Sequence, residues 1–280
     1  MVEKTKILIL GAGGMLGHEL MAVFSHDNPI GLTSADLDIT DLKQAQKKLQ
    51  ELKPDIVVNA AAYTAVDDCE QNRDLAMKVN GEGPGNVAKI CTSLDAILVH
   101  FSTDYVFNGQ KADGYAEDYD KMDPLSVYGE SKALGEKLIQ KNCQKYYILR
   151  TAWLYGKNGI NFVDTMIKLG QEKKELKVVN DQHGSPTYAK DLAIRTKEIL
   201  FNFKPTFGIY HTTNAGDCTW YEFANEIFKI KNIQTKVMPC TSDEFPRPAR
   251  RPDYSILLNT KLPAMRPWQD AVREYLIQQV

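Results

Sequence analysis

The stretch Lys6-Ile-Leu-Ile-Leu-Gly-Ala-Gly-Gly-Met-Leu-Gly17 decides the fold. Its apolar residues come first and are typical of a strand that is buried on both faces. Gly11, Gly14 and Gly17 follow, and they open an amphipathic helical stretch over Met15–Phe24. A strand, a glycine-rich turn and a helix in this order predict dinucleotide binding, because the turn lets a pyrophosphate approach the free N–H groups of the helix N-terminus.

The same alternation continues through the first half of the chain. Short apolar runs predict further strands, and amphipathic stretches between them predict helices. The predicted strands cover 29–33, 55–58, 96–101 and 146–149, and the predicted helices cover 42–52, 74–93 and 131–141. This β-α-β order indicates an α/β fold with a Rossmann-type doubly wound parallel sheet, which binds ligands at the carboxyl ends of its strands.

After residue 150 the pattern loosens, and prolines and glycines become frequent. Four prolines fall within Pro239–Pro252, so this segment cannot be a continuous helix, and we expect a loop that becomes ordered on a ligand. We predict an NAD(P)-binding domain over 1–150. A smaller substrate-binding lobe is predicted mainly over 151–280, with the chain crossing between the lobes.

Composition excludes several classes of function. The 280 residues are 43% hydrophobic and 25% charged, as in a soluble globular protein. With 34 basic and 36 acidic residues the net charge is −2, so no nucleic-acid partner is expected. No apolar run is long enough to cross a membrane. The five cysteines form no C-x-x-C pair and predict reduced thiols in a cytoplasmic protein, without a metal site.

The most informative short segment is Tyr128-Gly-Glu-Ser-Lys132. A tyrosine and a lysine four residues apart lie on one face of a helix. The ammonium is expected to lower the pKa of the phenol, which then exchanges a proton with a carbonyl oxygen near neutral pH. Ser102 and Thr103 follow the strand 96–101 and can hydrogen-bond the same oxygen. A structural role in turns remains the alternative for both hydroxyls.

The choice between NADH and NADPH stays open. The second strand runs into Gly31-Leu-Thr-Ser34, which is neither acidic nor basic, and Asp36 and Asp38 come slightly later. An acidic residue at the end of this strand favours NAD, and a basic one favours NADP.

Taken together, the motifs occur in one order and resemble the dTDP-4-dehydrorhamnose reductase family of extended short-chain dehydrogenases/reductases. The matching segments run nearly end to end. They are Asp38–Asp41, Val58–Asp67, Ser102–Phe107, Val127–Lys132, Arg150–Tyr155, Asn161–Val163, Asp181–Thr187 and Arg251–Ser255.

The resemblance implies a reaction and a catalytic triad. Hydride from NADPH or NADH would reduce C4 of dTDP-4-dehydro-L-rhamnose to give dTDP-L-rhamnose. Tyr128 would donate the proton to the C4 oxygen, Lys132 would assist Tyr128 and bind the nicotinamide ribose, and Thr103 would polarise the ketone.

The resemblance also implies binding residues. Cofactor binding falls to Gly11, Gly14, Met15, Leu16, Asp38, Ile39, Ala62, Tyr63, Thr64, Tyr128 and Lys132, and substrate binding to Thr103, Asp104, Trp153 and Arg251. Trp153 would flank the deoxy sugar and Arg251 would hold the diphosphate. Ordinary roles in the core and in a solvated loop remain the alternatives for these two residues, while His183 and His211 are expected to be structural.

Some members of the family form a dimer that is linked by a metal on three glutamates. Glu19 matches the first, but Lys190 stands where the second would lie. A charged lysine cannot ligate Mg²⁺, so no metal is predicted. A homodimer stays open, but not one linked by Mg²⁺.

Two other functions remain as alternatives. A 4,6-dehydratase or 4-epimerase is disfavoured. Dehydratases carry an acidic pair directly after the threonine of the triad, but here Asp104 is followed by Tyr105 and the glutamate is missing. A non-catalytic dinucleotide-binding subunit, similar to the β subunit of methionine adenosyltransferase, would not require the intact Thr103, Tyr128 and Lys132. A reductase of another nucleotide-linked deoxysugar stays open, since only pocket contacts separate such substrates.

Overall fold

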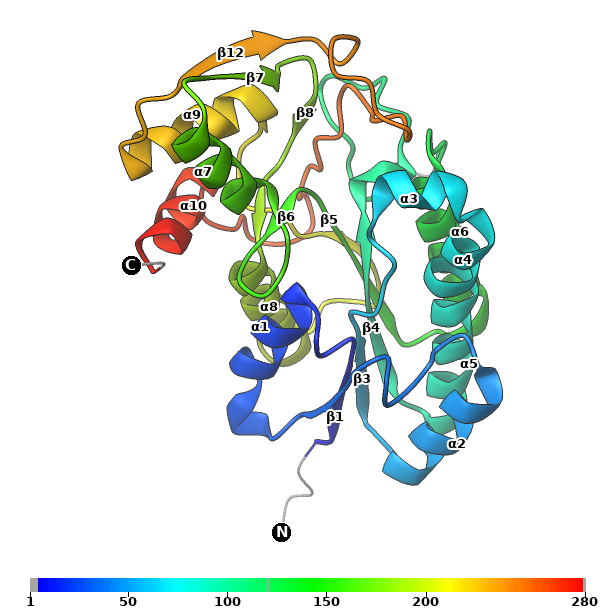
Figure 1. The fold of residues 1–280 in the computed structure, drawn as a ribbon. Coiled ribbons are helices and arrows are strands. Elements are labelled where there is room, and N and C mark those ends of the chain that lie inside the picture. Colours follow the sequence, from blue (N-terminus) through cyan, green and yellow to red (C-terminus); the bar gives the residue numbers. More distant parts are fainter. Residues whose placement is uncertain (1–4, 120, 279–280) are drawn as a thin grey trace.

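A six-stranded parallel sheet forms the centre of the computed structural model, which describes residues 5–119 and 121–278 (Figure 1). The strand order is β10-β5-β4-β3-β1-β2. The chain adds β2 on one side of β1 and β3 on the other, and this switch point between β1 and β3 is where such sheets bind ligands. The predicted doubly wound parallel sheet is therefore confirmed. The strands are β1 (Ile7–Leu10), β2 (Ile30–Leu32), β3 (Ile56–Asn59), β4 (Ile97–Thr103), β5 (Tyr146–Thr151) and β10 (Gly208–His211).

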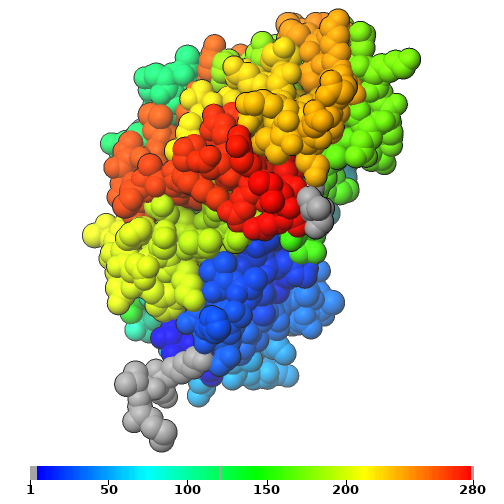
Figure 2. All heavy atoms as spheres, turned by 90° about the vertical axis from the view of Figure 1, so that its left-hand side faces the viewer, coloured from blue at the N-terminus to red at the C-terminus, as the bar shows by residue number. Residues whose placement is uncertain are grey.

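Helices cover both faces of the sheet, and each face has its own apolar cluster. On one face lie α1 (Met15–Val23) and α8 (Ala189–Glu198), and Figure 2 shows this side of the molecule with the C-terminal helix above them. On the other face lie α2 (Leu42–Leu52), α5 (Gly83–Leu94) and α6 (Val127–Asn142). The strands between them are buried, which explains their continuous apolar character.

Two helices differ from their predicted bounds. The helix predicted to begin at residue 131 begins at Val127, because the Ser126 hydroxyl accepts a hydrogen bond from Gly129 N at 3.2 Å and caps the first turn. The helix predicted over 74–93 is divided into α4 (Arg73–Ala76), the π-helical η2 (Met77–Glu82) and α5. The earlier start of α6 brings Tyr128 into its first turn.

The second lobe packs around its own aromatic cluster. Its helices are α7 (Phe162–Glu172), α9 (Trp220–Lys231) and α10 (Trp268–Ile277). Its two-stranded pairs are β7 (Glu175–Val179) with β12 (Lys236–Cys240), β8 (His183–Gly184) with β11 (Cys218–Thr219), and β6 (Leu154–Tyr155) with β9 (Thr187–Tyr188). Four shorter helical segments complete the elements of the described residues: α3 (Val66–Gln71), η1 (Ser25–Asp27), η3 (Asp104–Val106) and η4 (Ile199–Phe203).

The expectation of a loop beginning at Pro239 is wrong at its start. Pro239 lies inside β12, which pairs only with β7, and an edge strand tolerates a residue without an N–H group. From residue 241 the chain is irregular, as predicted. We refer to residues 241–255 as the strap.

The chain passes between the lobes more than once. Both β10 and α8 come after residue 150, yet β10 pairs with β5 and α8 packs on α1. All five cysteines are buried and free. No helix in the described part of the chain is long and apolar enough to span a membrane.

Candidate active site

The glycine-rich turn places the N-terminus of α1 at the reversal point of the sheet. Gly11 has φ of +75°, and a Cβ atom there would lie 2.6 Å from the backbone nitrogen of Ala61. A Cβ on Gly17 would overlap the Gly11 carbonyl oxygen. Only glycine fits either position. Gly14 caps α1 without a side-chain hydrogen bond, so the first N–H groups of the helix remain available to a pyrophosphate.

Side chains of the predicted cofactor residues differ in accessibility. Leu16 and Ile39 are buried in the two core clusters, so only their backbones can face a ligand. Met15 packs against Gly156 and Gly159. The exposed Asp38 accepts a hydrogen bond from Thr40 N.

The loop after β3 carries the next group of predicted cofactor residues. Ala62 and Thr64 are exposed, and Tyr63 between them is half-buried. The Asn80 side chain holds the backbone of Tyr63 by accepting from its N–H at 2.8 Å and donating to its carbonyl at 2.9 Å. A polar side chain from η2 thereby fixes this loop beside the glycine-rich turn.

Thr103 and Tyr128 meet where β4 ends and α6 begins. Thr103 is the last residue of β4, and its hydroxyl donates to Asp104 Oδ1 at 2.9 Å and accepts from Tyr105 N at 3.2 Å. The rings of Tyr105 and Tyr128 meet edge to face, with centroids 5.8 Å apart. The structure therefore brings the hydroxyl groups of Thr103 and Tyr128 together, whereas the Ser102 hydroxyl donates to Glu136 instead.

The sequence-based expectation of a lowered Tyr128 pKa is wrong, because the surroundings of the phenol act in the opposite direction. Burial and the neighbouring Asp104 carboxylate raise the pKa of the Tyr128 phenol above its usual value, and a hydrogen bond with Thr103 offsets this only in part. The Lys132 ammonium donates instead to the Phe101 carbonyl at 2.6 Å and to His100 Nε2 at 3.2 Å. The phenol thus keeps its proton throughout the neutral pH range.

Two further ionisable groups of the site are buried. Burial lowers the pKa of Lys132 to about 8, against the opposing attraction of Glu136. Burial raises the pKa of Asp104 to about 6, although hydrogen bonds with Ser255 and Thr103 favour its charged form. Perturbed groups of this kind are typical of functional sites.

Arg251 reaches the site from the strap. Its guanidinium donates to both carboxylate oxygens of Asp67 in α3, at 2.6 and 3.0 Å. The Ala249 N–H also donates to Asp67, and Arg247 lies 3.7 Å from it. These hydrogen bonds hold the pKa of the Asp67 carboxyl below its usual value. Arg251 also hydrogen-bonds Tyr105, which connects the strap to the edge of the Tyr128 ring.

Trp153 lies on the side of the second lobe. Its backbone has φ of +47°, and its indole stacks on Trp220 with centroids 3.5 Å apart. A Cβ on Gly184 would collide with this indole. Both indoles are half-buried, so the stacked pair offers an apolar surface as well as core packing.

Lys190, which stands where the second glutamate of a metal-linked dimer would lie, and the adjacent Asp191 both take part in ion pairs. Lys190 Nζ lies 2.7 Å from Glu274, and Arg266 pairs with Asp191 at 2.8 Å. Burial raises the pKa of Glu19. Within residues 5–119 and 121–278, no group of three or more histidine, cysteine, aspartate or glutamate side chains is arranged to hold a metal ion.

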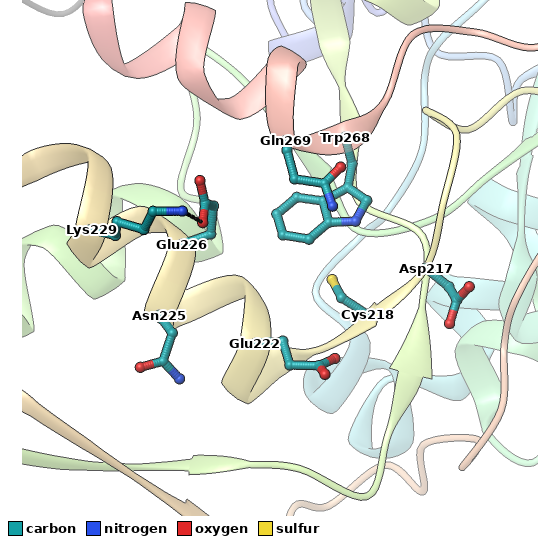
Figure 3. A pocket seen from close by; sticks show the side chains of 8 residues that line it. All are labelled: Asp217, Cys218, Glu222, Asn225, Glu226, Lys229, Trp268 and Gln269. Atoms are coloured by element: carbon teal, nitrogen blue, oxygen red, sulfur yellow. Dashed lines mark hydrogen bonds and ion pairs between the residues drawn. The ribbon is translucent and has the colours of Figure 1, made fainter.

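Two surface hollows lie away from Tyr128. The larger, of about 380 Å³, lies between one side of α9 and the start of α10 (Figure 3). Asp217, Glu222 and Glu226 line it, and its Lys229 is paired with Glu226. Such a negative rim repels a diphosphate. The smaller hollow, of about 210 Å³, is lined by parts of 213–217 and 256–259 and includes none of the predicted site residues.

Sequence reasoning missed the buried polar groups behind the triad. Arg150 of β5 and Glu136 of α6 form an ion pair at 2.7 Å with both side chains at most 2% exposed. The Ser102 hydroxyl donates to the same carboxylate at 2.5 Å. His100 and Asn59 lie side by side on β4 and β3. The available signals were the spacing of four between Lys132 and Glu136, and a histidine within an apolar strand.

The fold and this constellation define a Rossmann-fold reductase of the short-chain dehydrogenase/reductase class. The chain belongs to the family described as RmlD substrate binding domain, whose family model matches residues 5–280. The resemblance drawn from the motifs is thereby confirmed.

Curated relatives span nearly the whole chain. The Bacillus subtilis spore coat polysaccharide biosynthesis protein SpsK is 45% identical, covering 97% of both chains. A Streptomyces griseus dTDP-4-dehydrorhamnose reductase is 41% identical, covering 95% of this chain and 91% of its own. A Streptomyces antibioticus protein named probable dTDP-4,6-dihydroxy-2-methyloxan-3-one 4-ketoreductase is 42% identical, covering 95% and 93%.

A solved structure has the same fold. The Bacillus anthracis dTDP-4-dehydrorhamnose reductase in complex with NADP superimposes with a TM-score of 0.94 at 40% identity, covering 98% of this chain and 99% of that chain.

Proposed function

We propose that the chain reduces the C4 ketone of dTDP-4-dehydro-L-rhamnose to give dTDP-L-rhamnose, with NADPH or NADH as cofactor. The observation that carries the proposal is the meeting of Thr103 and Tyr128 at the carboxyl end of β4, with Lys132 one turn further along α6. The names of the full-length relatives support the same reaction. We place the reaction in the cytoplasm, where five buried free thiols suit a reducing compartment.

The residues present fit a nicotinamide dinucleotide. Gly11 and Gly17 leave no room for side chains at the turn, and the N-terminus of α1 is uncapped by any side chain. Backbone groups of Gly14, Met15 and Leu16 would hold the pyrophosphate. The loop 62–64 would line the middle of the cofactor, and the backbone at Asp38 and Ile39 its adenosine end. The bound cofactor supplies the hydride that C4 receives.

Tyr128 is proposed to donate the proton to the C4 oxygen. Its raised pKa keeps the phenol protonated at neutral pH, so the proton leaves only as negative charge develops on the oxygen. The Thr103 hydroxyl would hydrogen-bond the same oxygen and stabilise that charge. Lys132 would stabilise the phenolate that remains and bind the ribose hydroxyls.

The strap and the second lobe are proposed to bind the sugar nucleotide. Arg251 presents a planar guanidinium, which matches a diphosphate in bidentate fashion. Trp153 would place its ring against the deoxy sugar, and Asp104 would contact the sugar next to Thr103. In this division, residues 1–150 hold mainly the cofactor and 151–280 mainly the sugar nucleotide.

The direct test is NADPH oxidation, followed at 340 nm with dTDP-4-dehydro-L-rhamnose, with NADH in parallel. We expect rapid oxidation, and the ratio of the two rates gives the cofactor preference. If the protein binds NADPH but neither NADPH nor NADH is oxidised, the proposal is overturned.

A second candidate is the reduction of another dTDP-linked 4-ketosugar. It is favoured by the relative from Streptomyces antibioticus, which carries a different substrate in its name at 42% identity. Running both keto sugars in the same assay separates the candidates by the ratio of their kcat/KM values.

A further inference from the structure

His100 is a completely buried histidine that the proposed reaction does not use. It lies in the middle of β4 with 0% of its surface exposed. Its Nε2 is 3.2 Å from Lys132 Nζ, and its Nδ1 is 3.2 Å from the side-chain amide of Asn59. A buried imidazole is costly unless its nitrogens are hydrogen-bonded, and these two partners account for both.

The hydrogen bonds of the Lys132 ammonium indicate the role of His100. A charged ammonium has three N–H groups and no acceptor. The Phe101 carbonyl takes one at 2.6 Å, and His100 Nε2 is placed to take the second. One N–H group remains, and the two fixed bonds determine its direction.

The protonation state of His100 follows from its burial and from its hydrogen bond with Lys132. Burial, and then the charge of Lys132, lower the pKa of His100 well below its usual value, so the ring is neutral. A neutral ring that accepts from Lys132 at Nε2 carries its proton on Nδ1, and this N–H faces Asn59.

The Asn59 side-chain amide is fixed by its own hydrogen bond. Its Oδ1 accepts from Ala61 N at 3.2 Å, which leaves Nδ2 beside His100 Nδ1. The Nδ1 proton has its acceptor in the backbone carbonyl of Asn59, whose hydrogen bond with the ring favours a proton there. Nε2 is thereby left to accept from the charged Lys132.

We propose that His100 is a positioning residue for Lys132. His100 accepts a hydrogen bond from one N–H of the ammonium, so that a single N–H is left for the Tyr128 phenol and the cofactor ribose. Asn59 sets the tautomer of His100 from the neighbouring strand. His100 touches no ligand because it is wholly buried, so it acts only through Lys132. The proposal rests on the proposed function for its kinetic test.

Three substitutions separate this role from simple packing. The side chain of His100→Gln reaches the position of Nε2 and offers an acceptor to Lys132. The side chain of His100→Asn reaches only the position of Nδ1, and His100→Leu fills the space without an acceptor. Each variant is measured for kcat, for the KM of the sugar nucleotide, for the NADPH dissociation constant and for its melting temperature.

We expect His100→Leu and His100→Asn to lose about tenfold or more in kcat, because a hydrogen bond to a charged group is lost. The KM of the sugar nucleotide should stay the same, while NADPH binds more weakly. His100→Gln should restore kcat to within about threefold of wild type. A Gln variant no better than the Leu variant, or a fully active Leu variant, overturns the proposal.

Ile148→Val is the matched control for packing. Ile148 lies opposite His100 on β5 and is also 0% exposed, but none of its atoms bonds Lys132. Its kcat and NADPH affinity should equal those of wild type even if its melting temperature falls. Loss of kcat in this control, in proportion to melting temperature, would mean that His100 is merely structural.

The two proposals fail in different ways. If wild-type protein oxidises no NADPH with any keto sugar, the proposed function is wrong. The pattern of NADPH affinities among the three His100 variants still tests the positioning role. If wild type turns over and the three variants match it, only the positioning role is wrong.

Discussion

The candidate site is held in two different ways on its two sides. Thr103, Tyr128 and Lys132 stand on β4 and α6, where regular hydrogen bonding fixes each backbone. Arg251 stands on the irregular strap and is held mainly through one carboxylate, Asp67. The groups proposed for proton transfer are therefore organised by the sheet and α6, while the group proposed for the diphosphate is held mainly by its ion pair with Asp67.

The difference also concerns burial. Lys132 and Asp104 are taken out of water, and their pKa values move toward neutrality. Arg251 and Asp67 remain partly exposed, at 17% and 27% of their side chains, and keep their charges. Substitutions on the first side should therefore change kcat and pH dependence, and those on the second side should change substrate affinity.

The largest effect is expected for Tyr128→Phe. Loss of the proton donor should lower kcat by about a hundredfold to ten-thousandfold. NADPH affinity should stay within about twofold, because the ring keeps its packing against Tyr105. Steady-state oxidation at 340 nm and a fluorescence titration with NADPH give both values. Normal turnover by this variant would remove the proton-donor assignment.

Asp104→Asn should change stability more than any other substitution in the site. The pKa of Asp104 is about 6 in the folded protein and 3.8 as an ordinary carboxyl, so wild type loses stability as the pH rises through this range. At pH 7.5 the variant should therefore gain up to about 3 kcal/mol in free energy of unfolding.

The pH dependence of that gain is its control. At pH 2.5 the carboxyl is protonated in both states, and wild type and Asp104→Asn should unfold at the same denaturant concentration. Urea titrations at the two pH values provide the comparison. A gain that is equal at both would show that packing, and not ionisation, is responsible.

Titration of Lys132 should appear in the kinetics of the free enzyme. Because its pKa is about 8, kcat/KM should fall by about tenfold for each pH unit above that value. Lys132→Arg keeps its charge and should show no decrease up to pH 10, whatever its absolute rate. A wild-type profile that stays flat from pH 7 to 10 would contradict the assignment.

On the strap side, Asp67→Asn should raise the KM of the sugar nucleotide about tenfold and leave kcat nearly unchanged. The carboxylate no longer orients Arg251, but the triad is untouched. Asp68→Asn, the next residue in α3, is the matched control and should resemble wild type. A fall in kcat without a change in KM would place Asp67 on the side of proton transfer.

The smallest effect is expected at the start of the strap. Lys177 and Glu244 form an ion pair at 2.6 Å with both side chains about half exposed. Exposed pairs contribute little, so Glu244→Gln should leave the KM of the sugar nucleotide within about twofold. A larger change would mean that the Lys177–Glu244 pair helps to place Arg251.

The sequence predicted the side of the site that regular structure builds. The strands follow from local periodicity, and the sheet confirms them. The glycine-rich turn and the Tyr128–Lys132 spacing come from short motifs, and Tyr128 and Lys132 both lie in α6. The triad was recognised through its motifs, since Tyr-x-x-x-Lys alone occurs on many helices. The start of α6 was missed because it depends on the Ser126 cap.

What could not be predicted depends on lateral neighbours. His100 meets Asn59 through the register of β4 against β3, and Arg251 meets Asp67 across 184 positions of the chain. β10, with the sequence Gly-Ile-Tyr-His, lacks the continuous apolar run that marks β1 and β3. The raised pKa of Tyr128 was also unpredictable, because helix spacing does not tell where the Lys132 ammonium donates its hydrogen bonds.

The buried cysteines have a practical consequence for placing a probe on the strap. Burial raises the thiol pKa of Cys69, Cys91, Cys218 and Cys240, which keeps the reactive thiolate scarce, and Cys143 is buried as well. Maleimide reagents should therefore find almost no native target in the folded protein. A single cysteine introduced at the exposed Phe245 would carry a spin label or fluorophore on the strap itself, against a chemically silent background.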